Sequence, residues 1–212
     1  MDIKNKLLPF LHEYPLISSK SLDFKDFISV IELINQKKHL TPDGFNIIKS
    51  IATAMNRNRS SESRTKYYDS NNFKNSCLTP HYIQGFTDGE GCFYYYLDRN
   101  KPIYDYASFE ISQKSTEEPL LYKINNYFKG TGTISKRRNQ DNIITSSTLK
   151  IQNRKSIKEI IIPFFNDYTL ITIKIQRYNI WKKLITMYTN KEYKTKLGRE
   201  KMISLKKTLF NI

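Results

Sequence analysis

Two carboxylates, Asp88 and Glu90, lie in the glycine-rich stretch YIQGFTDGEGCFYYY, which spans Tyr82 to Tyr96 and occurs once in the sequence. Carboxylates can take part in metal or acid–base chemistry. Three glycines surround them, and aromatic, strand-like sequence follows at once. The stretch is therefore the first candidate for a functional site. The alternative is an ordinary helix end that carries incidental acids.

A short helix is expected to position these acids. Thr79 and Pro80 resemble an N-cap followed by proline at the first helical position, which predicts a helix running toward Gly89. Gly85 and Gly89 are four residues apart and so share one face of that helix. Each glycine costs about 1 kcal/mol relative to alanine, which close approach of another backbone would offset. Gly91 is expected to let the chain leave the helix.

The segments after the helix alternate between strand and helix patterns. The alternation of Ala107, Phe109 and Ile111 with polar residues is typical of a half-buried strand. The predicted elements, in chain order, are strands at 92–98 and 104–113, a helix at 117–128, hairpin strands at 130–139 and 142–151, and helices from 155 onward. The expected order is thus helix, two strands, helix, two strands, helices.

The charge balance favours a polyanionic partner. The 35 Lys and Arg residues exceed the 20 Asp and Glu residues, for a formal net charge of +15, and such a field most often serves nucleic acid. Polar and cationic side chains stand opposite the apolar strand faces, where they could donate to phosphates and base edges. These candidates are Tyr94, Tyr96, Tyr106, Ser108, Ser135, Arg137, Thr148 and Lys150, with Lys136 and Arg138 beside the hairpin tip. A merely solvated polar face is the alternative.

The remaining side chains exclude several classes of protein and of metal site. Cys77 and Cys92 are too few for a disulfide framework, and the three histidines show no zinc-ligand spacing with them. No stretch approaches the roughly 18 apolar residues of a membrane span, so we expect a soluble protein without a membrane partner. The chain is rich in Asn, Ile, Lys and Tyr, whose codons are A/T-rich, and this favours an organellar genome.

An internal repeat divides the chain. LLPFLHEYPLISSK (Leu7 to Lys20) resembles IIPFFNDYTLITIK (Ile161 to Lys174) at a constant offset, and each copy leads into two helices joined by a turn. Strand-like segments precede only the second copy. We therefore expect residues 1–57 to be the helical remnant of a first unit, 58–77 a polar linker and 78–212 a complete unit.

IQGFTDGEG (Ile83 to Gly91) resembles the nine-residue motif of the LAGLIDADG homing endonucleases and intron maturases, in the variant written GFxDGEG. The strand order and both repeated helix segments also resemble that family. The resemblance implies an α+β fold whose αββαββα unit carries a saddle-shaped antiparallel sheet along the DNA major groove. It also implies that motif helices of two units pack together through Gly85 and Gly89.

The resemblance further implies roles for single residues. Glu90 is the expected catalytic carboxylate and the ligand of a divalent ion, Mg²⁺, at the scissile phosphate. Asp88 is expected to shape the helix end rather than to bind metal. Gln113 resembles the polar residue that the family keeps near the metals, and Lys150 or Arg154 is expected to supply the basic group.

The sequence departs from two-motif members of the family because only one motif is present. The first motif was lost, is encoded separately or lies outside this chain; a second unit on another chain, or self-association through Gly85 and Gly89, could supply it. The leading hypothesis is a site-specific double-strand DNA endonuclease of intron homing. The alternatives are a non-catalytic maturase that binds group I intron RNA or another structured RNA, and a decaying reading frame. A mitochondrial location is expected, with the chloroplast as the alternative.

Overall fold

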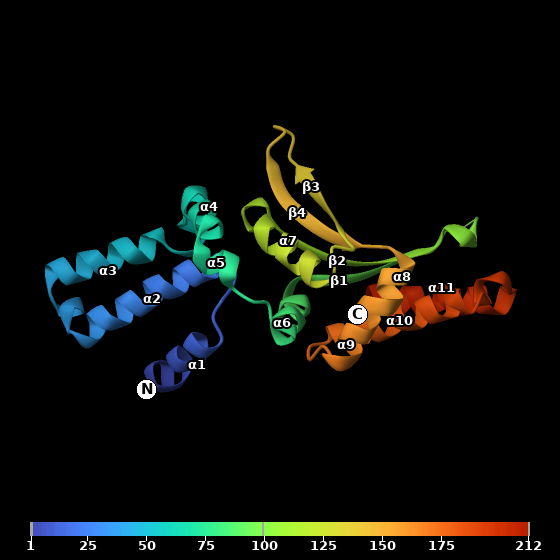
Figure 1. Cartoon of the computed structure of the whole chain (residues 1–212), viewed down its shortest axis with the longest axis horizontal. Coiled ribbons are helices and arrows are strands. Elements are labelled where there is room, and N and C mark those ends of the chain that lie inside the picture. The colour runs from blue at the N-terminus through green and yellow to red at the C-terminus, as the bar shows by residue number, and fades with distance from the viewer. Residues whose placement is uncertain (1, 99, 212) are drawn as a thin grey trace. The chain divides into compact units, whose positions relative to one another are not determined.

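The computed structural model describes residues 2–98 and 100–211, which form two compact units divided between Cys77 and Leu78. Figure 1 shows their helices and strands. Among the described residues, no helix has the length and apolar character needed to cross a membrane.

The C-terminal unit contains the sheet. Its elements are α6 (Pro80–Glu90), β1 (Gly91–Tyr96), β2 (Tyr106–Lys114), α7 (Glu118–Tyr127), β3 (Thr133–Arg138), β4 (Ile144–Ile151), α8 (Arg154–Ser156), α9 (Ile162–Asp167), α10 (Lys174–Thr189) and α11 (Lys196–Asn211). The strands form one antiparallel sheet in the order β1-β2-β4-β3, and β3 and β4 are visibly curved (Figure 1). The predicted α+β class and order of elements are confirmed.

Helices cover one face of this sheet. Across the strands, Phe93 of β1 pairs with Phe109 of β2, which pairs with Ile151 of β4, and all three side chains are buried. The ring of Phe165 from α9 packs against Phe93 and Phe109 at centroid distances of 5.3 and 5.4 Å. Because side chains alternate along a strand, the neighbouring polar residues face the other side.

Helix α6 begins as predicted. The Thr79 hydroxyl accepts a hydrogen bond from the backbone N–H of Tyr82 at 3.1 Å, with proline at the first helical position. The chain leaves the helix at Gly91 as expected, but the reason differs, because the Gly91 backbone is ordinary extended chain that any residue can adopt. Glycine is required there by space, since a Cβ would lie 2.5 Å from Cγ2 of Thr87.

Helix α10 closes the edge of the sheet at β1. The indole N–H of Trp181, a fully buried side chain, donates to the backbone oxygen of Tyr94 at 2.9 Å. An unpaired strand edge would otherwise expose such groups to other chains. The bond also fixes β1 against α10.

The N-terminal unit is entirely helical within the described residues. Its helices are α1 (Leu8–Glu13), α2 (Lys20–Asn35), α3 (Pro42–Ala54), α4 (Ser61–Asp69) and α5 (Asn71–Asn75). The helix pairs predicted from the repeat are confirmed, since α2 and α10 each have 16 residues and each leads through a turn into a second helix.

The turns of the two copies share their detailed geometry. Lys37 and Lys191 both adopt the left-handed conformation, at φ 58° and 60°. The hydroxyl of Thr41 then accepts the N–H of Gly44 at 3.2 Å, and in the second copy the bond from Gly198 to its threonine is 3.1 Å. The repeat seen in the sequence is thus also a repeat of structure.

Residues 58–77, expected as a linker, contain the helices α4 and α5. Ser60 and Ser70 cap them by accepting backbone N–H groups. Tyr67 and Tyr68 are buried, and the Tyr67 hydroxyl donates to the backbone oxygen of Ile17 at 2.8 Å. The polar sequence concealed these helices because a few aromatic side chains, rather than an apolar stripe, anchor them.

Candidate functional site

Glu90 is the last residue of α6 and is exposed. The next residue, Gly91, opens β1 and pairs with Ile111 of β2. Among the described residues, the Glu90 carboxylate has no hydrogen bond or salt bridge. It therefore lies free at the junction of helix and sheet.

Lys174, the first residue of α10, holds this junction together. Its ammonium donates to the backbone oxygens of Thr87 and Gly89 at 2.9 and 3.2 Å, which caps the end of α6. Burial lowers the pKa of Lys174, while the negative charges of Asp88 and Glu90 act in the opposite direction. A cation is therefore fixed beside the free carboxylate.

Asp88 accepts hydrogen bonds from the loop that precedes α10. Its carboxylate accepts the backbone N–H of Ile171 at 2.9 Å, and the N–H and hydroxyl of Thr172 at 3.2 and 2.6 Å. One turn earlier on α6, Gln84 donates to the backbone oxygen of Thr169. These bonds are compatible with the structural role expected for Asp88.

Gln113 lies near the end of β2, two residues beyond Ile111 and opposite Ser147. It is half-buried, and its position in the alternation places it on the helix-covered side of the strand. Arg154, the alternative basic residue, donates to the backbone oxygen of Asp105 at 3.0 Å and to the Tyr188 hydroxyl at 2.8 Å.

The uncovered face of the sheet brings together most of the predicted nucleic-acid-binding residues. The strand pairs on this face are Tyr94 with Ser108, Tyr96 with Tyr106, Ser112 with Thr148, Ser135 with Thr148, and Arg137 with Ser146. Lys150 completes this polar face. Its ammonium forms an ion pair with Glu110 at 3.1 Å and lies 5.2 Å from the ring centroid of Tyr106.

Three predicted contact residues are less available to a ligand on this face. Ser108 has no exposed surface, and its hydroxyl donates to Glu110 at 2.7 Å, so a ligand on the polar face would not touch it directly. Lys136 lies on the helix-covered side and forms an ion pair with Glu118 at 2.9 Å. Arg138, at an irregularity of β3, donates to the backbone oxygen of Asn142 in the hairpin turn.

The glycine stripe on α6 is open. A Cβ built on Gly85 or on Gly89 would meet no heavy atom of the described residues within 4 Å, and both glycines are exposed. The stripe leaves room for another backbone to approach closely.

The carboxylate oxygens of Glu90 are suitable ligands for a metal ion that also binds phosphate oxygens. Within the described ranges, no group of three or more His, Cys, Asp or Glu side chains could enclose a metal ion. Mg²⁺, however, usually keeps several waters and needs only one or two protein carboxylates beside phosphate oxygens. The partial negative charge at the end of α6 also favours a cation there.

Sequence reasoning missed Lys174 as a site residue. The signal was present, since Lys174 matches Lys20 in the internal repeat. Its position beside Glu90 nevertheless depends on the fold, because 84 residues separate them (174 − 90).

Comparisons with known proteins agree on the kind of protein that shares this architecture. The family described as LAGLIDADG endonuclease matches residues 83–185. The "Probable intron-encoded endonuclease 3" of Neurospora crassa is 32% identical over 92% of this chain and 37% of its own length. The "Probable intron-encoded endonuclease 2" of the same organism is 26% identical over 98% of this chain and 48% of its own length. The chain thus spans less than half the length of these relatives.

Solved structures share the fold over more of their length. The LAGLIDADG homing endonuclease I-LtrWI bound to target DNA is 31% identical, with a TM-score of 0.80 over 96% of this chain and 70% of that one. I-SmaMI, bound to uncleaved DNA in the presence of calcium ions, is 27% identical, with a TM-score of 0.81 over 96% and 71%.

Proposed function

This chain belongs to the LAGLIDADG endonuclease family, and from that premise we propose that it binds double-stranded DNA on its polar face and hydrolyses a phosphodiester bond at Glu90. The observation that carries the proposal is the free Glu90 carboxylate at the end of the sheet, beside the fixed charge of Lys174. The biological role that we propose is intron homing.

The polar face supplies the DNA contacts. Tyrosine, serine and threonine hydroxyls there can donate to base edges, while Arg137 and Lys150 can neutralise phosphates. The net charge of +15 would draw the chain to any polyanion. Specificity then depends on which of the neutral side chains reach the groove.

Hydrolysis is proposed to occur where α6 meets β1. Glu90 would hold Mg²⁺ there together with phosphate oxygens, and the chemistry supplied by the bound ion is activation of a water molecule and stabilisation of charge on the phosphate. Lys174 keeps the end of α6, and with it Glu90, in place. Its positive charge is proposed to stabilise the negative charge that develops in the transition state.

This assignment moves the basic role from Lys150 to Lys174. Lys150 is paired with Glu110 on the polar face, where it suits DNA binding. Gln113 is proposed to act from the end of β2 as a polar residue near the metal.

A second LAGLIDADG unit is the proposed protein partner. One motif acid can serve one scissile phosphate, whereas a double-strand break requires two. The open stripe of Gly85 and Gly89 is the surface against which the helix of that unit would pack. The unit could come from another chain or from a second copy of this one.

We propose a mitochondrial location. Two further relatives are named after introns of mitochondrial genes: an ND4 intron of Podospora anserina, 35% identical over 57% of this chain, and a cox1 intron of Schizosaccharomyces pombe, 29% identical over 80%.

The proposed function is tested by giving the protein a choice of nucleic acids. The chain is incubated with Mg²⁺ and a randomised library of DNA duplexes, in parallel with structured RNAs, and the cleaved DNA ends are sequenced. We expect a defined DNA motif at the cleaved ends. Tight binding of structured RNA without any DNA cleavage would instead identify a maturase.

A further inference from the structure

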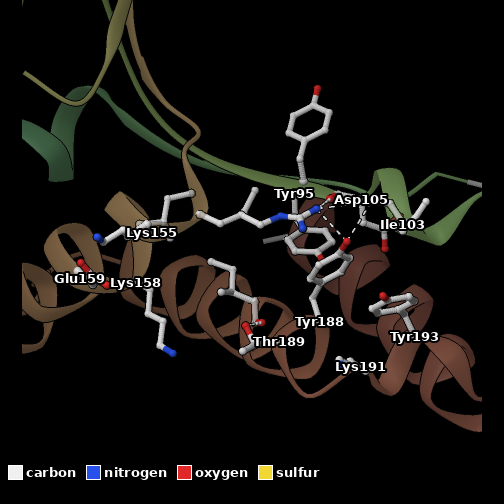
Figure 2. A pocket seen from close by; sticks show the side chains of 15 residues that line it. Tyr95, Ile103, Asp105, Lys155, Lys158, Glu159, Tyr188, Thr189, Lys191 and Tyr193 are labelled. Carbon is white, nitrogen blue, oxygen red and sulfur yellow. Dashed lines mark hydrogen bonds between the residues drawn. The ribbon is translucent and has the colours of Figure 1, made fainter.

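A cavity of about 500 Å³ opens in the C-terminal unit (Figure 2), and neither Glu90, Lys174 nor Gln113 lines it. Its walls come from β1, the start of β2, the α8 turn and the end of α10. Sites for small ligands commonly have about 300 to 1,000 Å³. The cavity is therefore large enough for a ligand of the size of a nucleotide.

Hydrogen bonds hold one wall of the cavity in place. The Arg154 guanidinium lies 4.3 Å from the ring centroid of Tyr188 and donates to that residue's hydroxyl and to the backbone oxygen of Asp105. The Tyr188 hydroxyl in turn donates to the backbone oxygen of Ile103 at 2.9 Å, and Figure 2 shows this group of bonds. The wall is preorganised, which lowers the entropic cost of binding a ligand.

A stack of two aromatic rings lies beside this wall. The rings of Tyr188 and Tyr193 are stacked, with centroids 4.7 Å apart and an interplanar angle of 18°. Ile157 and Ile185 add apolar lining. Aromatic and apolar side chains of this kind accept the face of a nucleobase with little regard to its identity.

A buried hydroxyl without a partner also belongs to the lining. Tyr95 is only 1% exposed, and its hydroxyl has no hydrogen bond within the described part of the chain. A buried polar group left without a partner is costly. A ligand that offers a hydrogen-bond acceptor would remove that cost.

The charges around the cavity favour an anion. Lys155, Lys158 and Lys191 line it and form no ion pair with any residue that the structure describes. Two acids also line it, but Asp105 is paired with Arg199, which leaves Glu159 as the opposing charge. Cations therefore exceed free acids at this site.

We propose that this cavity binds one unstacked nucleotide. The base packs on the face of Tyr193 that is turned away from Tyr188 and accepts a hydrogen bond from Tyr95, and the phosphate is held by Lys155 and Lys158. Two sources share this chemistry: a free mononucleotide, and an unpaired nucleotide of a single strand. The proposal does not depend on DNA cleavage at Glu90.

Binding to the whole chain is measured by calorimetry with three probes: the 5′-nucleoside monophosphates, a short unstructured single strand, and inorganic phosphate. The main variant is Tyr95→Phe, which removes only the unpartnered hydroxyl. It should melt no lower than the wild type and bind the nucleotide about 3- to 10-fold more weakly. The double variant Lys155→Met/Lys158→Met should weaken binding further.

The matched control is Lys207→Met, which removes an exposed charge on α11 outside the cavity and should leave nucleotide affinity unchanged. If the strand binds more tightly than any monophosphate and Tyr95→Phe weakens both, the natural source is an unpaired nucleotide; equal affinities indicate a free nucleotide. The proposal is overturned if neither nucleotide probe binds, if binding survives the cavity variants, or if phosphate alone binds as well as the monophosphates.

Discussion

At the scale of single residues, the two acids of the motif differ in their bonding. Asp88 accepts three hydrogen bonds from Ile171 and Thr172, whereas Glu90 is left free beside Lys174. Two residues apart on a helix, their side chains point in nearly opposite directions. The alternative interpretation, an ordinary helix end with incidental acids, can explain the hydrogen bonds of Asp88. It does not account for a free carboxylate next to a partly buried cation.

Replacing Lys174 with methionine should separate catalysis from binding. The variant loses the two hydrogen bonds to α6 and the charge beside Glu90. We expect the cleavage rate at saturating DNA to fall by about 100-fold or more, as for other fixed transition-state charges, while DNA affinity changes little. Single-turnover kinetics and a binding isotherm in Ca²⁺ measure the two effects.

The matched variant is Lys150→Met, on the polar face. It should weaken DNA binding and leave the cleavage rate at saturation nearly unchanged, because Lys150 is paired with Glu110 on the polar face. The opposite pattern, with the rate lost in Lys150→Met and kept in Lys174→Met, would return the basic role to Lys150.

At the scale of elements, strand alternation decides which side chains meet the nucleic acid. The sequence predicted the strands and the apolar rows, because Ala107, Phe109 and Ile111 alternate clearly. The surroundings of Ser108 and Lys136 were hidden, since neither the Glu110 bond nor the Glu118 ion pair follows from local pattern. Register and tertiary partners had to come from the fold.

Two adjacent residues of β3 test this alternation. Arg137 lies on the polar face, while Lys136 lies on the helix-covered side and is paired with Glu118. Arg137→Ala should weaken DNA binding and reduce the slope of log K against log salt by about 1. Lys136→Ala should leave that slope unchanged. Equal slopes for the two variants would contradict the assigned face.

Helix α10 gives a prediction about alkaline pH. Burial raises the pKa of Tyr178 from its ordinary value of 10.0 to about 12, and its hydroxyl donates to the backbone oxygen of Ile162 and to Asn166. The unfolded chain therefore loses this proton before the folded chain does. Consequently, the free energy of unfolding should fall between about pH 10 and pH 12.

Tyr178→Phe should make the free energy of unfolding fall less steeply with pH, by a slope equivalent to at most one proton. The slope is measured by denaturant unfolding at a series of pH values. A two-unit shift corresponds to about 2 to 3 kcal/mol across the window. Identical slopes in the variant and the wild type would show that Tyr178 titrates normally.

At the scale of the whole molecule, the repeat shows which structural features can be predicted from the sequence and which cannot. Phe10 and Phe164 are equivalent in the repeat, and their helices form alike. Phe10 is nevertheless 56% exposed and Phe164 only 9%, because Phe164 packs among aromatic residues of the C-terminal unit such as Phe128. The pattern predicted the helices and the sheet, and the family resemblance pointed to Glu90 as the catalytic acid. It could not predict burial or the approach of Lys174 to α6, which depend on long-range packing.

The open glycine stripe predicts opposite effects on stability and on assembly. Gly85→Ala should raise the free energy of unfolding of the chain by up to about 1 kcal/mol, because alanine favours helix and no atom in the described part of the chain obstructs the new Cβ. Gly85→Leu should be tolerated by the fold but block pairing with a second unit. Pairing is monitored by DNA cleavage and by sedimentation at several protein concentrations.

Gly198→Ala is the control for glycine replacement. Its Cβ would lie 2.2 Å from the backbone oxygen of Glu192, so this variant should lose stability. If Gly85→Leu cleaved DNA as fast as the wild type, the stripe could not be a seam between units.

The most direct test of the central claim is the rate of DNA cleavage as a function of Mg²⁺ concentration, at equal DNA occupancy, for the wild type and Glu90→Gln. Glu200→Gln, which changes an exposed carboxylate on α11, serves as the control. We predict a saturable Mg²⁺ dependence for the wild type and the control. Glu90→Gln should lose at least about 1,000-fold in rate, roughly 4 kcal/mol of transition-state stabilisation, with unchanged DNA affinity. Equal rates for Glu90→Gln and the wild type would contradict the assignment of catalysis to Glu90.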